Sequence, residues 1–415
     1  MYQHKVESVG RSFWSKLVLV CVMMFFVFLG DAIYSDWTPT FIQQSLGGSL
    51  AMGLVMSFSS LAGLVSDLVF PQLLRKMNSR KIILFAVLTS LFFGIIMRLS
   101  IWAPIIILFL SGMVVWGVYY EFLGFGAAGY ISSHTPSHFR TSAWSVMNSF
   151  RGLAYFLGPL IGSLVALNYG NKATVSMAMF FTFIGLIFLI LIRSRKNTSE
   201  VVEEKEDRLD VFLEMKHWGV LLKSVWPIAV ISLVLGILDA TFWTTGTVFN
   251  DNLAMIHVYG GLFLPLYELP MVVVGLLVAK LGIYKGKKKL TELFMMGSGI
   301  LLMILSMTDR VELILVISLL VGIMTAVCWP LKDAIYTDVV NRMGFRGKHM
   351  IGLSGSTVSV AYILGPIISG AIAQTFGEKK TFVIIGVFVS VMALLLLVFT
   401  PKKMRLPESE IESWN

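Results

Sequence analysis

The sequence predicts an all-α membrane protein, with twelve transmembrane helices arranged as two pseudo-symmetric six-helix bundles. Three observations lead to this prediction: an apolar composition, a series of long apolar runs, and a motif that occurs twice. Hydrophobic residues make up 56% of the 415 residues and charged residues 14%, with a mean hydropathy of +0.81. Such a chain can bury its surface only in lipid. It must cross the lipid as helices, because lipid offers no hydrogen-bond partner to free backbone groups.

The apolar runs give the predicted helices in order. A transmembrane helix needs about 20 residues, and twelve runs are long enough. They lie near residues 17–41, 49–74, 82–101, 104–131, 143–168, 173–192, 225–249, 255–281, 290–308, 311–338, 350–375 and 381–400.

One long polar segment, residues 193–222, separates the sixth run from the seventh. The sequence therefore predicts an N-terminal bundle over 1–192, a cytoplasmic linker over 193–222 and a C-terminal bundle over 223–415. We interpret the linker as solvated chain. A short amphipathic helix lying on the membrane surface is the alternative.

A repeated motif supports the division into two halves. Residues 154–159 (AYFLGP) return as residues 361–366 (AYILGP), at an offset of 207. Earlier in each half, residues 29–30 and 37–38 return as 235–236 and 243–244, at an offset of 206. A repeat at a fixed spacing indicates duplicated structural units.

The positions of Lys and Arg predict the orientation. They gather before the first run, after the second and after the eighth, and they are sparse in the alternate loops. Because cytoplasmic loops are enriched in Lys and Arg, both termini are expected in the cytoplasm. We expect a multi-pass protein of the cell's inner (plasma) membrane.

Two local patterns in this arrangement resemble the major facilitator superfamily of transporters. Gly158-Pro159 and Gly162 in the fifth run resemble the end of that family's antiporter motif, and Gly365-Pro366 repeat part of it in the eleventh. Gly158 and Gly162 share a helix face and allow a neighbouring backbone to approach. Pro159 can kink its helix. Helix packing alone is one interpretation of the motif, and a bend that changes during transport is the other.

The second pattern is the basic loop after the second run. Lys76 and Arg80 resemble the basic end of the family's gating motif. The loop departs from that motif because Arg75 occupies the acidic position and Asn78 the glycine position. The resemblance implies two bundles that alternate in access around a central path, lined by the first, fourth, seventh and tenth helices.

Ionisable residues inside the runs are the candidate functional groups, because each costs a few kcal/mol to place in a membrane. We set Asp36 and Arg98 aside as structural, since both lie near the outer ends of their runs. The remaining residues are Asp31, Asp67, Glu121, Arg151, Asp239, Glu268, Lys332 and Asp333.

Glu121, Arg151, Asp31 and Asp239 are the predicted proton-coupling residues. Glu121 and Arg151 lie at similar depths in consecutive helices, so we expect them to meet, either as a fixed ion pair or as a pair that protonation separates. Asp31 and Asp239 both lie near mid-membrane. With the offset of 206 between the halves, Asp31 matches residue 237, which is two positions before Asp239. If the two halves were strictly symmetric, only one of the two acids would therefore face the central path. We favour Asp239.

Aromatic and charged residues near these acids are the predicted substrate contacts. Packing or interfacial anchoring is the alternative for each aromatic residue. The candidates are Tyr34, Trp37, Trp116, Tyr120, Trp243, Glu268, Trp329, Lys332, Asp333 and Tyr336.

These features predict a secondary active transporter that works by alternating access and is coupled to protons. Efflux of an organic or amphipathic solute by antiport is favoured. Proton-coupled uptake by symport, lipid flipping and a transport-inactive receptor or scaffold are the alternatives. The sequence lacks an ATP-binding motif and the residue patterns of enzymes. We expect no cofactor, no metal and no nucleic-acid partner. The expected partners are a small-molecule substrate, protons and the lipid bilayer, and we expect a monomer.

Overall fold

The computed structural model describes residues 2–74, 77–135, 140–192, 211–281, 286–343 and 347–401. These residues are mostly helical, and they include no strand. The α-helices are α1 (Tyr2–Leu46), α2 (Ser49–Leu73), α3 (Ser79–Trp102), α4 (Ile106–His134), α5 (Arg140–Leu191), α6 (Val211–Phe242), α7 (Thr245–Ile256), α8 (Phe263–Leu281), α9 (Lys287–Leu305), α10 (Val311–Met343), α11 (Gly347–Phe376) and α12 (Glu378–Phe399). A 3-10 turn, η2 (Gly260–Leu262), precedes α8.

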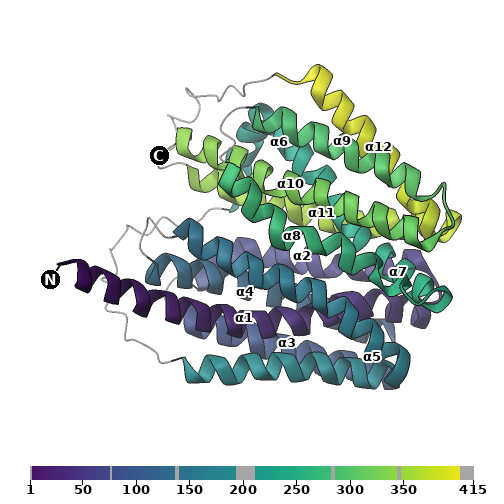
Figure 1. Ribbon diagram of the computed structural model, residues 1–415, viewed down its shortest axis with the longest axis horizontal. Coiled ribbons are helices and arrows are strands. Elements are labelled where there is room, and N and C mark those ends of the chain that lie inside the picture. The colour runs from purple at the N-terminus through teal and green to yellow at the C-terminus, as the bar shows by residue number, and fades with distance from the viewer. Residues whose placement is uncertain are drawn as a thin grey trace.

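Nine helical stretches of the described chain are long and apolar enough to cross a membrane. One of them, in α5, contains two predicted helices. Gly170 has a φ of 76° and a ψ of 178°, a conformation that favours glycine, and the chain reverses direction there (Figure 1). Another stretch joins α6 to α7 across a short break after Phe242. Helices α8 and α9 lie outside the nine.

The helices form two bundles that follow the two halves of the sequence. In Figure 1, α1 to α5 lie in the lower bundle and α6 to α12 in the upper one. One apolar core consists of residues between Leu17 and Leu189 together with Val248, and a second consists of residues between Ile231 and Leu396. Part of the predicted linker is helical, because α6 begins at Val211. Residues 193–210 lie outside the described residues.

Small residues bring the two bundles into close contact. A Cβ added to Gly53 of α2 would lie 2.0 Å from the carbonyl oxygen of Pro366 in α11. A Cβ added to Gly370 of α11 would lie 2.4 Å from the carbonyl oxygen of Ser49. Glycine at both places lets the backbones of α2 and α11 approach.

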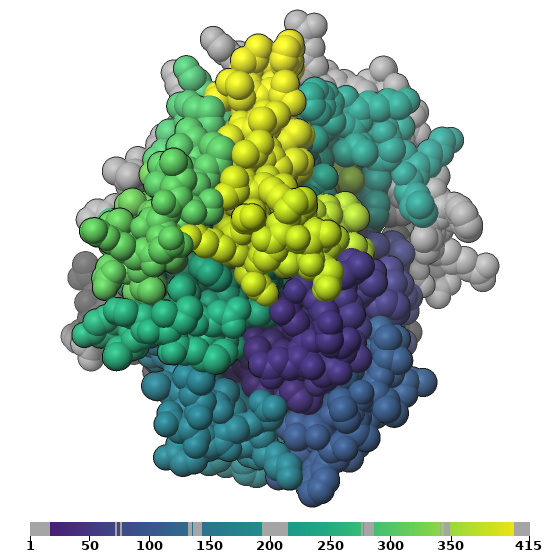
Figure 2. All heavy atoms as spheres, turned by 90° about the vertical axis from the view of Figure 1, so that its right-hand side faces the viewer, coloured from purple at the N-terminus to yellow at the C-terminus, as the bar shows by residue number. Residues whose placement is uncertain are grey.

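Hydrogen bonds join the bundles at the end of the molecule where α7 lies, which we call the distal end (right in Figure 1). Figure 2 views this end and shows the purple and blue N-terminal half against the green and yellow C-terminal half. Among the described residues, the hydrogen bonds between the halves are Thr40–Asp251, Ser163–Asp251, Asn250–Ser163, Gln43–Glu378 and Ser49–Gln374. The structure is therefore a conformer closed at the distal end.

Candidate functional site

Asp31 lies in the middle of the N-terminal bundle and is fully buried. The indole Nε1 of Trp116 donates to its Oδ1 at 2.8 Å, and the hydroxyl of Tyr120 donates to its Oδ2 at 3.0 Å. The hydroxyl of Tyr155 also donates to Oδ2. Two helices, α4 and α5, thus direct polar groups to the one carboxyl of α1. Such convergence satisfies an acceptor that would otherwise be costly to bury.

Asp239 has a similar environment in the C-terminal bundle. It is 9% exposed on α6, its Oδ1 accepts a hydrogen bond of 2.7 Å from the hydroxyl of Tyr267, and its Oδ2 accepts one from Tyr362. Tyr155 and Tyr362 are the same residue of the repeated motif, 207 positions apart. Each half therefore uses the tyrosine of its AY(F/I)LGP motif to bind a buried aspartate.

The motif glycines show which residues of the two halves are equivalent. A Cβ added to Gly158 would lie 2.3 Å from the Cβ of Ala32, and one added to Gly365 would lie 2.6 Å from the Cβ of Ala240. Ala32 and Ala240 are 208 residues apart. Asp31 and Asp239, which precede them, are therefore equivalent.

This equivalence corrects the register of 206 at the first helix of each half. Gly30 and Gly236, which that register pairs, approach different partners: Gly30 faces Thr182 in the second part of α5, whereas Gly236 faces Ala361 of α11. The expected conflict between Asp31 and Asp239 does not arise, because both face the tyrosine of their own motif.

Arg151 of α5 packs over aromatic rings and has no hydrogen-bonding partner among the described residues. Its guanidinium carbon is 5.4 Å from the ring centre of Tyr155 and 5.7 Å from that of Phe28. The residue is exposed, although it belongs to the middle of α5. Among the described residues it forms no ion pair within 4 Å and donates no hydrogen bond. A guanidinium with five N–H donors is thus left available.

The charge of Arg151 acts on carboxyls of both halves. It interacts electrostatically with Asp31 of the N-terminal half and with Asp239 and Glu268 of the C-terminal half. Glu268 is 7% exposed on α8 and lies beside Trp243. The ring of Trp243 packs edge-on against Tyr155 across the two halves, at 5.3 Å. The predicted residues Asp31, Arg151, Asp239, Trp243 and Glu268 therefore form one central group.

Glu121 does not join this group, and its expected contact with Arg151 is wrong. Its Oε1 lies 3.1 Å from the position of a Cβ on Gly63 of α2, and its carboxyl lies beside that of Asp67. The preceding residue, Tyr120, already binds Asp31. One residue along a helix turns the side chain by about 100°, so Glu121 points to α2.

Two predicted aromatic residues of α1 pack inside the N-terminal bundle. Tyr34 is 1% exposed, meets the ring of Phe93 edge-on at 5.0 Å, and its hydroxyl has no partner. Trp37 donates from Nε1 to Asn171 at 2.9 Å and stacks on Phe41 at 4.5 Å. Neither residue donates a hydrogen bond to Asp31, which is bound by Trp116, Tyr120 and Tyr155.

The predicted residues of α10 form a group of their own. The ammonium of Lys332 is 4.3 Å from the ring centre of Trp329 and 2.9 Å from Oδ1 of Asp333. Lys332 is 3% exposed, whereas the side chain of Asp333 is 65% exposed, so the two residues do not share one environment. The hydroxyl of Tyr336 lies 3.1 Å from that of Ser232 on α6.

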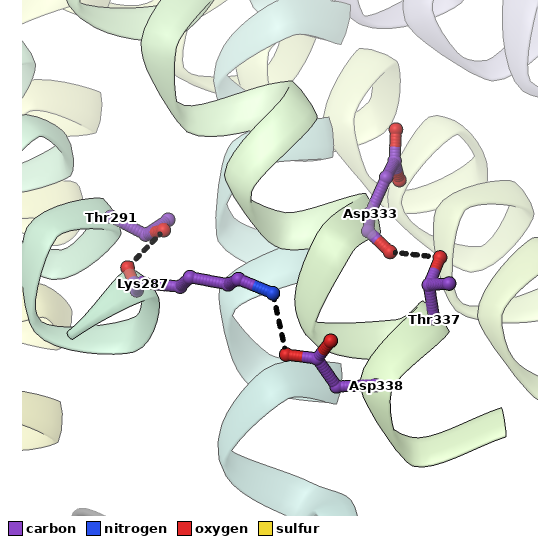
Figure 3. Close-up of polar contacts among 5 residues, drawn as sticks. All are labelled: Lys287, Thr291, Asp333, Thr337 and Asp338. Carbon is purple, nitrogen blue, oxygen red and sulfur yellow. Dashed lines mark hydrogen bonds and ion pairs between the residues drawn. The ribbon is translucent and has the colours of Figure 1, made fainter. Parts of the chain in front are cut away.

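Figure 3 shows how this stretch of α10 is tied to α9. The ammonium of Lys287 lies 2.6 Å from Oδ2 of Asp338, and the hydroxyl of Thr337 donates to the carbonyl of Asp333 at 2.8 Å. Thr291 donates to the carbonyl of Lys287 at 2.9 Å, one turn along α9. These contacts are local and structural.

The predicted conformational residues serve two kinds of contact. Pro159 and Pro366 lie inside α5 and α11, beside the glycines that approach Ala32 and Ala240. Arg80 donates to the carbonyls of Leu189 and Ile190 at 3.2 Å each, and so satisfies the last turn of α5. Lys76 lies outside the described residues.

Sequence reasoning missed one acid and misjudged another. Asp36 was set aside because it lies near the outer end of its run, but it is 2% exposed and therefore does not reach water. Gly162 and Ser163 of α5 lie against its Oδ2. Asp251 was placed beyond the seventh helix, whereas α7 continues to Ile256 and carries Asp251 into contact with α1 and α5.

Comparisons with known proteins agree with this architecture. The family model described as Major Facilitator Superfamily matches residues 4–159, 126–344 and 261–414. Quinolone resistance protein NorA of Staphylococcus aureus (strain MRSA252) is 24% identical over 397 residues, covering 90% of this chain and 94% of that protein. Nucleoside transporter NupG has a TM-score of 0.73 at 12% identity, covering 96% of this chain and 100% of that one.

A D-xylose-proton symporter has a TM-score of 0.69 at 13% identity, covering 94% of this chain and 99% of that one. At such low identity the two solved structures show the shared fold alone. The family model, in contrast, matches nearly the whole chain. The chain therefore belongs to the major facilitator superfamily, and it is an integral multi-pass membrane transporter rather than an enzyme.

Proposed function

We propose that this transporter is a proton-coupled antiporter that exports an organic or amphipathic solute, and that Asp31 and Asp239 bind the protons. The observation that carries the proposal is the pair of equivalent aspartates, each bound by the tyrosine of its repeat. Two equivalent acids facing a shared Arg151 form a charged group that contains residues of both halves.

The charge of the central group favours protons or a cationic solute. Asp31, Asp239 and Glu268 can carry three negative charges, against the one positive charge of Arg151. Ionised together, they leave an uncompensated negative charge in an apolar interior, which is costly. A proton or the cationic group of a solute removes that cost, and so each can displace the other.

Alternation between the two bundles would couple this exchange to transport. The predicted bundles, 1–192 and 223–415, rock about the central group, and access changes from one side of the membrane to the other. The unpaired guanidinium of Arg151 can move toward whichever carboxyl has lost its proton. In this mechanism Arg151 compensates the carboxyls in turn and is not part of a fixed ion pair.

Export is favoured because the relative that matches 90% of this chain is named a quinolone resistance protein. Glu121 and Asp67 provide a second candidate for proton binding, since two adjacent carboxyls in a membrane are most easily held when they share a proton. Uptake by symport, lipid flipping and a transport-inactive receptor or scaffold predict different fluxes, so one assay separates them.

The test is flux in proteoliposomes that contain a pH-sensitive dye, with a quinolone as the first solute. We expect the solute and protons to move in opposite directions. Asp31→Asn and Asp239→Asn should each lower gradient-driven flux at least about tenfold, because an amide cannot exchange the proton, while counterflow of labelled solute without a gradient persists. Asp309→Asn, at a fully exposed carboxyl, is the control.

Each other outcome has a defined meaning. Movement of solute and protons in the same direction indicates symport, and movement of a labelled lipid indicates flipping. If Glu121→Gln alone abolishes coupling, the proton site lies at the Glu121–Asp67 pair. If none of the three changes alters proton-coupled flux of an accepted solute, the assignment of the central group is wrong.

A further inference from the structure

A second group of acids joins the two halves at the distal end, apart from the central group. The hydroxyl oxygen of Ser163 on α5 lies 3.1 Å from Oδ2 of Asp36 on α1 and 3.4 Å from Oδ1 of Asp251 on α7. Thr40 of α1 donates to Oδ2 of Asp251 at 2.7 Å. One hydroxyl of the N-terminal half therefore connects a carboxyl of its own half with a carboxyl of the other.

The orientation of Asn250 determines what the Ser163 hydroxyl can do. The backbone N–H of Leu264 donates to Oδ1 of Asn250 at 3.2 Å, so the amide nitrogen of Asn250 points the other way. That nitrogen donates to the oxygen of Ser163 at 3.3 Å. Ser163 therefore accepts one hydrogen bond from α7, and it has a single hydrogen left to donate.

Two carboxyls compete for that single hydrogen. If both carboxyls were ionised, the Ser163 hydroxyl could donate its hydrogen to only one of them. The second carboxylate would then face the lone pairs of the Ser163 oxygen, which repel it. If one carboxyl carries a proton, it donates to Ser163 while Ser163 donates to the other. Every contact among Asp36, Ser163, Asn250 and Asp251 is then a hydrogen bond with one donor and one acceptor.

The surroundings of Asp36 also favour a bound proton. It is 2% exposed, and its Oδ1 has no hydrogen-bond partner in the part of the chain that the structure describes. Burying an ionised oxygen without a hydrogen-bond donor costs much free energy, whereas burying a neutral carboxyl costs much less. The only charge of the described chain that acts on Asp36 is the like charge of Asp251.

No cation of the described chain offsets these two carboxyls: α1, α5, α7 and α8 bring no Lys, Arg or His within ion-pair distance. The other charged groups at the distal end have separate contacts. Among them are Lys172, which lies over Trp102; Arg98, which donates to Ser176; Glu378, which accepts from Gln43; His257, next to Glu312; and Lys379, next to Asp309.

We propose that Asp36 and Asp251 share one proton, which closes the distal end, and that release of this proton opens it. The inference rests on the proposed alternation between the halves, and it adds a proton site that is separate from Asp31 and Asp239. When the proton leaves, two adjacent carboxylates on opposite halves repel each other across the contact. Asp251 is partly exposed, so the proton has a path to water.

The test measures the distal distance directly, without a solute. Spin labels are placed at Tyr169→Cys in the N-terminal half and Val258→Cys in the C-terminal half, which are 77% and 92% exposed. The buried native thiols Cys21 and Cys328 are replaced by Ala. Distance distributions are then recorded in lipid nanodiscs between pH 5.5 and 8.5. For one proton released per opening, the open-to-closed ratio should rise up to about tenfold per pH unit.

Neutral variants and a matched carboxyl separate this site from others. In Asp36→Asn and Asp251→Asn, an amide N–H takes the place of the carboxyl proton and cannot be released. The open-to-closed ratio of each variant should therefore change less than about twofold per pH unit. Glu378→Gln removes a carboxyl from another contact at the same end and should keep the wild-type response. Asp309→Asn, at a fully exposed carboxyl outside the central group, should keep it too. Because the readout is a distance recorded without a solute, a failure to find proton-coupled flux does not by itself remove this result.

Three results would overturn the proposal. The first is a wild-type distance that does not depend on pH. The second is an unchanged pH response in Asp251→Asn. This variant is the decisive one, because Asp251 is partly exposed and its substitution disturbs packing less than a substitution at the buried Asp36. The third is a response to Na⁺ at constant pH in place of a response to pH, which would assign the oxygen cluster to a metal ion.

Discussion

Asp31 and Asp239 occupy equivalent places in the two bundles, each bound by the tyrosine that precedes its Gly-Pro motif. Tyr155 donates to Asp31 and Tyr362 donates to Asp239. The two halves therefore keep a local structure that their overall sequences do not make obvious.

Removal of either tyrosine hydroxyl should have a similar effect. Tyr155→Phe and Tyr362→Phe each leave a buried aspartate with one donor fewer, and a hydrogen bond to a charged group contributes about 1.5–3 kcal/mol. We expect gradient-driven flux to fall about tenfold or more in each variant. Tyr34→Phe is the control, because its buried hydroxyl has no partner. A large loss in the control, or in only one of the two variants, would contradict the equivalence.

The charge of Arg151 should matter more than its shape. Within the described chain, Arg151 is the only positive charge that acts on Asp31, Asp239 and Glu268, so we expect Arg151→Gln to abolish gradient-driven flux. Arg151→Lys keeps the charge and, since Arg151 forms no bidentate pair, should retain a measurable fraction of the flux. Equal loss in both variants, with normal folding by size-exclusion chromatography, would indicate that guanidinium geometry is required.

The close approach of α5 to α1 should make Gly158 intolerant of a methyl group. A Cβ there would lie 2.3 Å from the Cβ of Ala32, so the helices must shift, at a typical cost of about 1–3 kcal/mol. Gly158→Ala should lower the melting temperature in detergent. Gly124→Ala is the matched control, since a Cβ there meets nothing within 4 Å and alanine favours the helix. Equal melting temperatures for both variants would contradict the close approach.

The ion pair between the α9–α10 loop and α12 should contribute little. Lys379 lies 2.5 Å from Oδ1 of Asp309, and its hydrogen bond and then its charge lower the pKa of Asp309. A lowered acid pKa contributes stability above the unfolded value of about 4, and that contribution is lost as the pH falls through the folded pKa. Because Asp309 is fully exposed, we expect Lys379→Met to leave thermal unfolding at pH 7 unchanged within error. A clear drop at pH 7 would show that the pair is stronger than its exposure implies.

The predicted orientation can be tested with the same labelling positions. A membrane-impermeant thiol reagent added to intact cells should label Val258→Cys, at the distal end, and should fail to label Ser199→Cys in the predicted cytoplasmic linker. Cys21 and Cys328 are buried and should stay unlabelled. The opposite pattern would reverse the orientation inferred from the Lys and Arg distribution.

The sequence predicted the helices and the duplication because both depend on composition and on a strong local motif. Asp31, Arg151, Asp239, Trp243 and Glu268 were recognisable as candidates, since polar groups are rare in apolar runs. Their grouping is a property of the structure, and the oligomeric state, the orientation and the coupling ion stay predictions. The twelve predicted helices correspond to the observed ones when α5 is divided at Gly170 and α6 is counted together with α7.

The other contacts of the site depend on how each helix is rotated about its axis. An offset inferred from identical residues in the two halves does not give that rotation. Matching Gly30 to Gly236 gave an offset of 206, whereas the contacts of Gly158 and Gly365 show 208. Glu121 was paired with the wrong helix because neighbours along the chain are not always the neighbours that a side chain faces. Asp251 was missed because the break between α6 and α7 shifted the end of the seventh helix toward α8.

The hydrogen bonds between Thr40, Ser163, Gln43 and their partners in α7 and α12 have a practical consequence. They make the distal face in Figure 2 a composite surface, with neighbouring contributions from both halves. An antibody fragment that recognises residues on both sides of this contact would have its complete epitope in the closed conformer alone. Such a reagent would trap that conformer from outside the substrate path, and would inhibit without resembling any solute.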